Sequence, residues 1–497
     1  MNRNRLLELY DNFNHWVLIV KNMFLYDGYG TVENSVISFN EYPPFTATFQ
    51  YMLLNLKGIY SEDTIIMAQN MLYFSMIMPL FHKVEWKQGK RKLFYLLPVV
   101  VLLPLVFYRN FYTDILVDGF IGILFALGLY EIFRNDKSKT YKYAILGSYA
   151  LALALTKNTG ILFAALLIFL EGINLIIDKV KTKKNIKKDI WGIGIIILTL
   201  VVFVGGWYLI INLQESEQMW DQTQEEQMNE EYKQTVIQSF VHELYTGSQE
   251  ITVQNLSTLI LFVMYITYSV CIYQKNKDKL EDKHRLRNIF IIMPIVMVIY
   301  ALGMLYSYLY LFRPDETLIL SSFNRYISSM LLAGFFLNTI ILGEIITWKN
   351  YYICIVLMFI LIFVPFEDIK DRYVEFNKYN ISVMAKRNEY GKINKYKNLL
   401  EENDVIYYVS NKFDNLYAVA ISKYEMMPIQ IISNDEISEG KFEDIIRNTA
   451  TYVYVLNEDL SFENRFKNIF DSNFESEEDS LYKIVKTGEQ IELQKVN

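Results

Sequence analysis

Apolar runs near the length of a bilayer crossing recur along the first three quarters of the chain. The hydrocarbon core of a bilayer is about 30 Å thick, and a helix of roughly 20 apolar residues spans it. This length predicts about ten transmembrane spans within residues 61–366, and hence a polytopic α-helical membrane protein. The spans lie near Thr64–His82, Leu93–Tyr108, Ile115–Phe133, Tyr143–Leu155, Thr159–Asp178, Ile190–Asn212, Leu256–Tyr273, Asn288–Phe312, Tyr326–Ile346 and Tyr351–Phe366.

The loops between these spans alternate sharply in basic content. One set, which begins with Lys83–Lys92, holds 22 lysines and arginines, whereas the opposite set holds five. Loops rich in lysine and arginine stay in the cytoplasm, by the positive-inside rule. The five basic residues of the opposite set are therefore expected outside, and they are Arg109, Lys157, Lys233, Arg313 and Arg325.

The pattern changes after Pro365. Residues 367–497 alternate short β-rich runs with amphipathic stretches, which is typical of βαβ units. Strands are predicted at Val405–Ser410, Ile429–Ser433, Thr451–Leu456 and Leu481–Val485, and helices near Leu416–Lys423, Phe442–Arg447 and Glu463–Phe470. This predicts a small α/β domain, which the alternation of the loops places outside the cytoplasm.

Composition narrows the function classes. Hydrophobic residues make up 52% of the chain and charged residues only 21%, which argues against an ordinary soluble enzyme. A net charge of −7 offers no basic surface for nucleic acid. Cys271 and Cys354 lie in apolar runs and the four histidines are scattered, so a metal, if one is used, would be Mg²⁺ or Mn²⁺ held by carboxylate oxygens.

The opening 60 residues precede the first predicted span and, by the same alternation of loops, begin outside. No signal peptide or earlier span accounts for that placement. We therefore expect this chain to lack an odd number of N-terminal spans that the full gene product carries.

This external region is the densest in acids, aromatics and turn signals. Phe13, Trp16, Val17, Val20 and Phe24 recur at helical spacing, which predicts an amphipathic helix over Asn12–Leu25 in the membrane interface. Lys21 would anchor it there. Asp11 stands at the start of this helix, where it is either an N-cap or a general base that accepts a proton from a hydroxyl acceptor.

Five short motifs follow one another along the chain: D-N-F-N-H-W from Asp11, Y-P-P-F from Tyr42, D-I-L-V-D-G from Asp114, L-T-K-N-T-G from Leu155 and S-F-N-R-Y from Ser322. Together they resemble the bacterial membrane glycosyltransferases of the GT-C type, such as protein O-mannosyltransferases and lipid A aminoarabinose transferases. The resemblance covers most of the chain. It implies a GT-C-like helical bundle in the bacterial cell membrane, a sugar donor linked to polyprenyl phosphate, an external hydroxyl acceptor on a glycan or protein, and inversion at the anomeric carbon.

In that family an acidic pair in the first external loop supplies the catalytic aspartate, and its position corresponds to Asp11. The second acid of the pair is replaced here by Asn12, so a metal site that uses both acids is in doubt. Asp118 matches the second external acid of the family and is, with Asp11, a candidate catalytic residue. An unpaired carboxylate inside a span is costly, so Asp118 should face a cavity or a partner.

Two cations are candidates for binding the donor phosphate. Lys157 separates two apolar runs on the external side, and Arg325 lies at the mouth of a span, where a guanidinium would bind phosphate through two hydrogen bonds. Snorkelling at the interface is the alternative interpretation of Arg325. Asp114 is a weaker candidate for the role of Asp118, and Glu41 is a candidate contact for the acceptor or a metal.

The favoured function is a membrane glycosyltransferase that builds or decorates a cell-wall or surface polysaccharide. A transporter or flippase of lipid-linked sugars is the alternative. Transporters place ionisable or broken-helix sites near the midplane of the membrane, whereas the acids here cluster outside. A third class, a membrane-anchored binding protein, fits less well because ten spans exceed what an anchor needs.

Overall fold

A computed structural model describes residues 4–29, 42–81, 90–134, 138–182, 186–213, 230–246, 256–276, 283–312, 314–345, 366, 370–410, 416–433, 441–457, 459–470, 474–488 and 490–496. The chain divides into two compact units. The first contains Met1, Glu41–Phe49 and Ile66–Glu375, and the second contains Asn2–Asn40, Gln50–Ile65 and Phe376–Asn497. The region expected as a separate N-terminal segment, residues 1–60, is thus shared between the two units.

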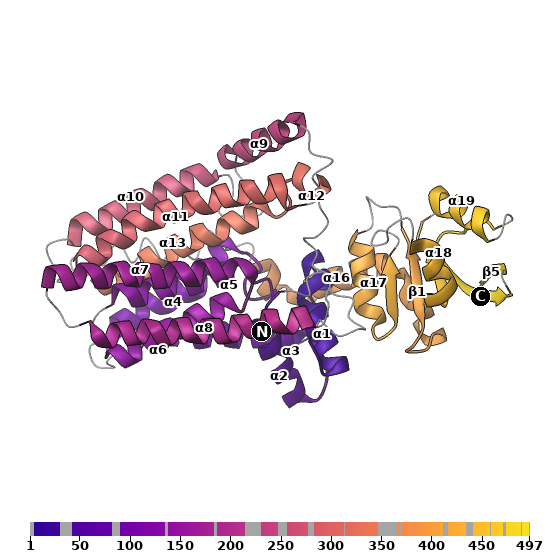
Figure 1. Ribbon diagram of the computed structural model, residues 1–497, viewed down its shortest axis with the longest axis horizontal. Coiled ribbons are helices and arrows are strands. Elements are labelled where there is room, and N and C mark those ends of the chain that lie inside the picture. The colour runs from indigo at the N-terminus through magenta and orange to yellow at the C-terminus, as the bar shows by residue number, and fades with distance from the viewer. Residues whose placement is uncertain are drawn as a thin grey trace. The chain divides into compact units, whose positions relative to one another are not determined.

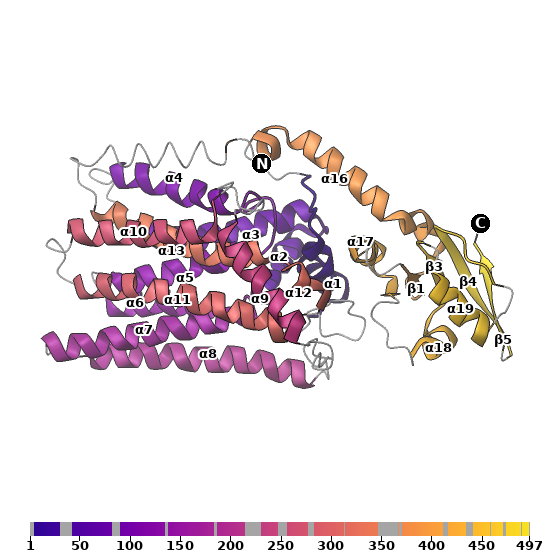
Figure 2. The same ribbon diagram turned by 90° about the horizontal axis from the view of Figure 1, so that it is seen from above.

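The first unit is helical, and its helices lie alongside one another (Figure 2). They are α4 (Lys90–Phe107), α5 (Asp118–Phe133), α6 (Lys139–Ala154), α7 (Asn158–Thr182), α8 (Lys187–Leu213), α9 (Glu230–Tyr245), α10 (Thr258–Asn276), α11 (Lys283–Tyr310), α12 (Pro314–Leu318) and α13 (Phe323–Ile345), followed by the short η5 (Lys370–Val374). Two helices run from one unit into the other, α2 (Phe45–Lys57) and α3 (Glu62–Ile77), and η2 (Met78–Phe81) continues α3.

Each of the first nine predicted spans coincides with a helix, and the tenth, Tyr351–Phe366, falls almost wholly outside the described residues. Five helical stretches are long and apolar enough to cross a membrane: Glu62–Phe81, Asn158–Val180, Lys187–Leu213, His284–Tyr310 and Phe323–Gly343. Tyr95–Phe107 and Thr258–Gln274 are shorter apolar helices. Within the described part of the chain, fewer than ten helices are therefore long and apolar enough to be transmembrane spans.

Burial separates two kinds of apolar helix in this unit. Every residue of α5 from Asp118 to Ile132 is buried, so α5 forms the centre of the bundle and packs against α13, α6 and α7. In contrast, α8 exposes Ile195, Leu198 and Val202 among other large apolar side chains. A surface of this kind is stable against lipid and not against water.

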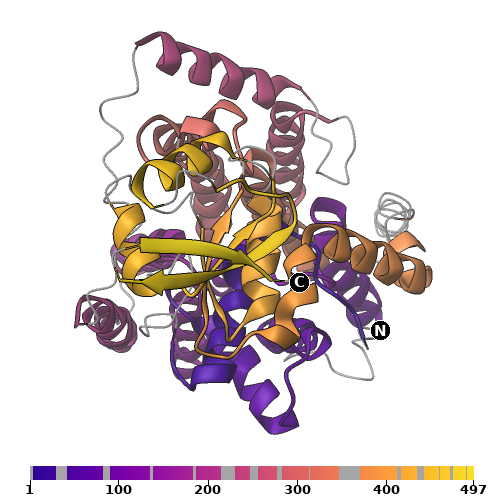
Figure 3. The same cartoon turned by 90° about the vertical axis from the view of Figure 1, so that its right-hand side faces the viewer.

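The second unit contains a five-stranded sheet with the order β2-β1-β3-β4-β5. Figure 1 shows it in orange and yellow, with β1 and β5 labelled. The strands are β1 (Val405–Val409), β2 (Gln430–Ser433), β3 (Tyr452–Val455), β4 (Ser480–Thr487) and β5 (Gln490–Lys495). β1 is parallel to β2 and β3, whereas β4 pairs antiparallel with β3 and β5. Four strands match the predicted ones; β5 was not predicted, and it forms a hairpin with β4 (Figure 3, yellow).

Alternation along the strands gives this sheet two buried faces. Tyr407, Val409 and Val453 pack with side chains of α18 (Phe442–Asp444), η9 (Ile445–Thr449) and α19 (Leu460–Ile469). Ile406 and Tyr408, one residue out of phase, pack with α17 (Leu416–Met426) and η6 (Lys392–Leu399). Because successive side chains of a strand point to opposite faces, helices cover both sides, as βαβ units require.

The N-terminal helix belongs to this second unit. η1 (Asn12–Trp16) and α1 (Val17–Tyr26) are helical as predicted, but burial extends over Leu18 and Ile19 as well as the predicted apolar stripe. The ring of Phe13 contacts those of Tyr417 and Tyr424 on α17. Aromatic packing against α17, rather than a polar face turned to water, explains why this helix is buried on nearly all sides. α16 (Phe376–Tyr390) completes the unit.

Candidate functional site

Three helix N-termini of the first unit meet around one carboxylate. Asp118 is the first residue of α5, Lys157 directly precedes α7, and Arg325 lies in the first turn of α13. Oδ1 of Asp118 is 3.1 Å from Nζ of Lys157, and Oδ2 is 3.1 Å from Nε of Arg325. Residues 39 and 207 positions apart along the chain are thus brought to one carboxylate, and all three had been singled out in the sequence.

Close backbone approaches fix these helix ends. A Cβ atom at Gly122, one turn after Asp118, would fall well within 3.0 Å of the carbonyl oxygen of Ser329, one turn after Arg325. A Cβ at Gly160 would clash in the same way with the carbonyl oxygen of Leu153. Glycine at these two positions allows α5 to approach α13, and the start of α7 to approach the end of α6, more closely than any other residue permits.

Aromatic rings surround the two cations. The ammonium of Lys157 lies 4.7 Å from the ring centroid of Tyr326 and 5.9 Å from that of Tyr42, and the guanidinium of Arg325 lies 5.1 Å from the Tyr326 ring. The hydroxyl of Tyr108 donates a 2.6 Å hydrogen bond to the carbonyl oxygen of Arg325. Such cation–π contacts are strongest where water is excluded.

Tyr42 and Tyr326 had no role in the sequence analysis, although both stand in motifs that it singled out. Their positions could have indicated a role, because Tyr326 directly follows Arg325 and Tyr42 directly precedes the proline pair. The segment that carries Tyr42 is held in place because the N–H of Phe45, the first residue of α2, donates to the carbonyl oxygen of Leu155, two residues before Lys157.

The electrostatics of this group favour an anion. Asp118 and Lys157 are 5% and 7% exposed, so their ion pair is shielded from water. Two cations against one carboxylate leave one excess positive charge. The N-terminal ends of three helices add partial positive charge of roughly half an elementary charge each. Backbone N–H groups at helix starts together with arginine and lysine are the usual means by which proteins bind phosphate.

Asp114 lies in the segment that leads into α5. Its Oδ1 accepts hydrogen bonds from the backbone N–H groups of Ile115 and Leu116, at 2.7 and 3.0 Å. The carboxylate therefore shapes the turn that leads into α5.

Two predicted site residues, Asp11 and Glu41, are not among the described residues of the first unit. Asp11 belongs to the second unit, directly before η1, and its side chain makes no cap hydrogen bond there. Glu41 falls outside the described residues. The structure therefore brings together Asp118, Lys157 and Arg325 within one unit and describes Asp11 in the other.

Metal-ligand clusters are not found among the described residues, where no three histidine, cysteine or acidic side chains gather. Asp118 lies between two cations, an arrangement that would repel a divalent ion instead of binding it. The residues of this site do not fit the Mg²⁺ or Mn²⁺ that was considered from the sequence.

A second buried charge cluster lies at the other end of α5. Arg285 of α11 donates to the carbonyl oxygen of Ile132 and pairs with Glu171 at 3.3 Å and with Asp178, both on α7. Lys142 of α6 also pairs with Glu171. Lys142, Asp178 and Arg285 lie near helix ends that the charge pattern assigns to the cytoplasmic side, whereas Glu171 lies within α7. Together they join α6, α7 and α11.

Comparison with known proteins gave structural matches alone. No family model and no curated protein matches the chain. Two solved structures of ArnT from Cupriavidus metallidurans are similar, each with 10% identity and a TM-score of 0.43. The apo structure is matched over 94% of this chain and 91% of its own, and the structure bound to undecaprenyl phosphate over 99% and 94%. ArnT is an aminoarabinose transferase, in the enzyme group that the motifs resemble. At this identity and TM-score, the similarity carries no argument about the site or reaction of this chain.

Proposed function

We propose that this protein is a bacterial membrane glycosyltransferase that moves a sugar from a polyprenyl-phosphate donor to an external hydroxyl acceptor. The observation that carries the proposal is the meeting of Lys157 and Arg325 on one carboxylate, at three helix starts of a largely apolar bundle. A phosphate with a hydrocarbon tail matches both properties, because its head is anionic and its tail partitions into lipid.

Transfer leaves the negative charge on the donor phosphate as the bond to the sugar breaks. Cations already in position stabilise such charge without having to reorganise, which is the largest contribution in many enzymes. Lys157 has three N–H donors and Arg325 has five, which is more than the ion pairs with Asp118 use. Asp118 holds both cations in a water-poor site and sets their positions.

Asp11 is the proposed general base, on the strength of the motif that it opens. It would accept the proton of the acceptor hydroxyl as that oxygen attacks the anomeric carbon from the face opposite the phosphate, which inverts the configuration. General bases contribute roughly 10²- to 10⁴-fold to rate. In this proposal the second unit, with its α/β sheet, lies outside the membrane.

Donor binding tests the role of the cations. The purified full chain in nanodiscs is titrated with undecaprenyl phosphate, and we expect Lys157→Ala and Arg325→Ala each to weaken binding by roughly 10- to 100-fold, the value of a hydrogen bond to a charged group. Lys233→Ala is the matched control, because Lys233 is also a predicted external cation but lies on α9 beside Glu230. If all three variants bind undecaprenyl phosphate as tightly as the unaltered protein, Lys157 and Arg325 do not bind the donor.

Sugar transfer tests the role of Asp11. We expect Asp11→Asn to abolish release of undecaprenyl phosphate from a glycosylated donor while binding of undecaprenyl phosphate stays unchanged. Retained transfer would exclude Asp11 as the base. If the protein instead moves a fluorescent lipid-linked sugar between the leaflets of a proteoliposome membrane without transferring the sugar to an acceptor, the alternative function, a flippase, is supported.

A further inference from the structure

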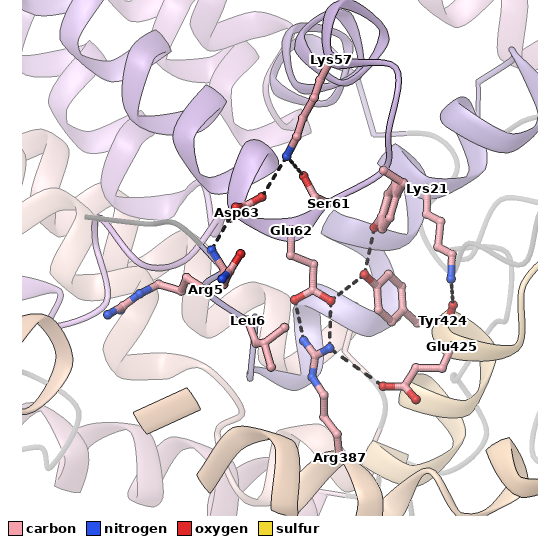
Figure 4. Close-up of a pocket in the computed structure, with 12 residues that line it drawn as sticks. Arg5, Leu6, Lys21, Lys57, Ser61, Glu62, Asp63, Arg387, Tyr424 and Glu425 are labelled. Atoms are coloured by element: carbon pink, nitrogen blue, oxygen red, sulfur yellow. Dashed lines mark hydrogen bonds and ion pairs between the residues drawn. The ribbon is translucent and has the colours of Figure 1, made fainter. Parts of the chain in front are cut away.

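The second unit carries an open cavity, lined largely by polar and charged residues, that neither the sequence motifs nor the proposed transfer reaction uses (Figure 4). Its volume is about 620 Å³, within the range of roughly 300–1,000 Å³ of small-molecule sites. The lining comes from the N-terminal segment Asn4–Leu6, from α1, from the turn between α2 and α3, and from α16 and α17. All of these lining residues belong to one compact unit.

The carboxylates in the wall are already paired. Glu62 accepts hydrogen bonds from two guanidinium nitrogens of Arg387 at 2.8 and 2.6 Å, from the Tyr424 hydroxyl at 2.7 Å and from the backbone N–H of Leu7 at 2.7 Å. Asp63 accepts from the backbone N–H of Asn4 at 3.0 Å and pairs with Lys57 at 3.4 Å. These carboxylates therefore have cationic partners of their own.

Lys21 differs from Lys57 and Arg387, the cations of the wall that pair with its carboxylates. Its ammonium donates to the carbonyl oxygen of Tyr424 and lies 4.5 and 5.8 Å from the ring centroids of Tyr424 and Tyr60. No carboxylate oxygen in the described part of the chain lies within 4.0 Å of it. An ammonium has three donors, so two remain for a ligand in the cavity.

The surroundings of Lys21 make it responsive to an added negative charge. Burial, together with the nearby cation of Lys397, lowers its pKa to about 7, while Arg387 also lowers the pKa, and Glu425 and Glu62 raise it. An anion at its side would raise this pKa again. With no ligand bound, the Lys21 side chain is therefore about half-protonated near neutral pH. Binding of an anion would complete its protonation.

We propose that this cavity binds a small acidic sugar, with the carboxylate of the sugar on Lys21. The ring of Tyr60, which is only partly buried, lies beside the ammonium and suits the apolar face of a pyranose. The buried ring of Tyr424 packs behind the ammonium. Asp63 and Ser61 line the opposite part of the wall and supply oxygens for sugar hydroxyls (Figure 4). The cavity is large enough for one or two sugar units. The inference does not depend on transfer activity, because it concerns binding alone.

Calorimetry on the full chain in nanodiscs tests the inference with three probes: glucuronate, glucose and inorganic phosphate. We expect glucuronate to bind with one-to-one stoichiometry and glucose to bind at least tenfold more weakly, because glucose lacks the charge. Lys21→Met should lower glucuronate affinity at least tenfold. Lys483→Met, at an exposed lysine of β4 in the same unit, should leave it unchanged.

Proton uptake provides a measurement on the unaltered protein, in case Lys21→Met fails to fold. Glucuronate remains ionised throughout, so binding at pH 8 should take up a proton from the buffer, and the affinity should fall about tenfold per pH unit above 7. The inference is overturned by binding without proton uptake, by phosphate binding as tightly as glucuronate, or by Lys21→Met binding as the unaltered protein does.

Discussion

A single carboxylate between two cations defines the candidate site at the scale of residues. Asp118 shares its two oxygens between Lys157 and Arg325, and the three side chains carry one net positive charge. Desolvating such a group is costly unless each charge keeps a partner. The role that we assign to Asp118 is therefore to keep two cations charged and in place until a phosphate arrives.

This role predicts an unusual response to Asp118→Asn. Loss of the carboxylate leaves two shielded cations without their partner, so the free energy of unfolding should fall by about 3–5 kcal/mol. A bound phosphate would replace the lost charge. Undecaprenyl phosphate should therefore raise the melting temperature of the variant more than that of the unaltered protein, as measured by thermal unfolding in detergent.

Asp114→Asn serves as the control for this prediction, because it removes a nearby carboxylate that accepts hydrogen bonds from the backbone N–H groups of Ile115 and Leu116. An equal ligand-induced shift in Asp118→Asn and in the unaltered protein would show that the phosphate does not reach this carboxylate.

At the scale of elements, the sequence predicts the helices and strands far better than their contacts. Apolar runs of bilayer length identify nine helices because each run is a local property of the chain. β5 was missed because Gln490–Lys495 has only two apolar residues, Ile491 and Leu493, and its position depends on pairing with β4. The turn at Gly488, with φ of 67°, was the available signal.

Contacts between elements depend on the packing of distant segments. The motifs single out Asp118, Lys157 and Arg325 separately. The hydrophobic pattern of the chain does not predict that the N-termini of α5, α7 and α13 lie close together. The surroundings of Lys21 illustrate the same limit, because its neighbours Tyr424 and Lys397 lie 403 and 376 residues further along the chain. An interfacial anchor was the natural expectation from local pattern alone.

Glycine contacts provide a test of how the helix starts are held. Ala at Gly122 would push α5 away from α13 at Ser329 and separate Asp118 from Arg325, so both stability and donor affinity should fall. Gly205 on α8 has open space around its Cβ position. Gly205→Ala should be neutral or stabilising by up to about 1 kcal/mol, since alanine is the better helix former.

Thermal unfolding and undecaprenyl phosphate titration of the two glycine variants measure the difference. If Gly122→Ala binds the lipid phosphate as the unaltered protein does, the close approach of these helices does not position the site.

The second charge cluster should contribute to stability alone. Glu171 pairs with both Arg285 and Lys142 and is fully buried, so Glu171→Gln leaves two cations with weakened partners. We expect a loss of about 3–5 kcal/mol in the free energy of unfolding. Glu230→Gln, at an exposed pair with Lys233, should cost less than about 1 kcal/mol.

Chemical denaturation in detergent would compare these two glutamate variants. A larger loss for Glu230→Gln than for Glu171→Gln would contradict the assignment, and so would a specific loss of donor affinity in Glu171→Gln.

At the scale of the whole molecule, the charge pattern of the loops predicts which parts meet the cytoplasm. Single cysteines at Lys187 and Lys483, in a background with Cys271 and Cys354 replaced by serine, would report this sidedness. We expect an impermeant maleimide to label the cysteine at position 483 in intact cells, and the one at position 187 only after lysis. Labelling of position 187 in intact cells would reverse the predicted orientation.

The apolar surface of α8 has a consequence for how this sequence diverges among descendants. Only 11% of its most apolar window is buried inside the protein, so lipid tails are the main neighbours of its side chains. Lipid tails pack about equally well against leucine, isoleucine and valine. Selection on α8 therefore preserves its hydrophobicity while one apolar residue replaces another. Gly122 and Gly160 accept no such exchange. Distant descendants should therefore keep these glycines and the charged trio long after overall identity has been lost.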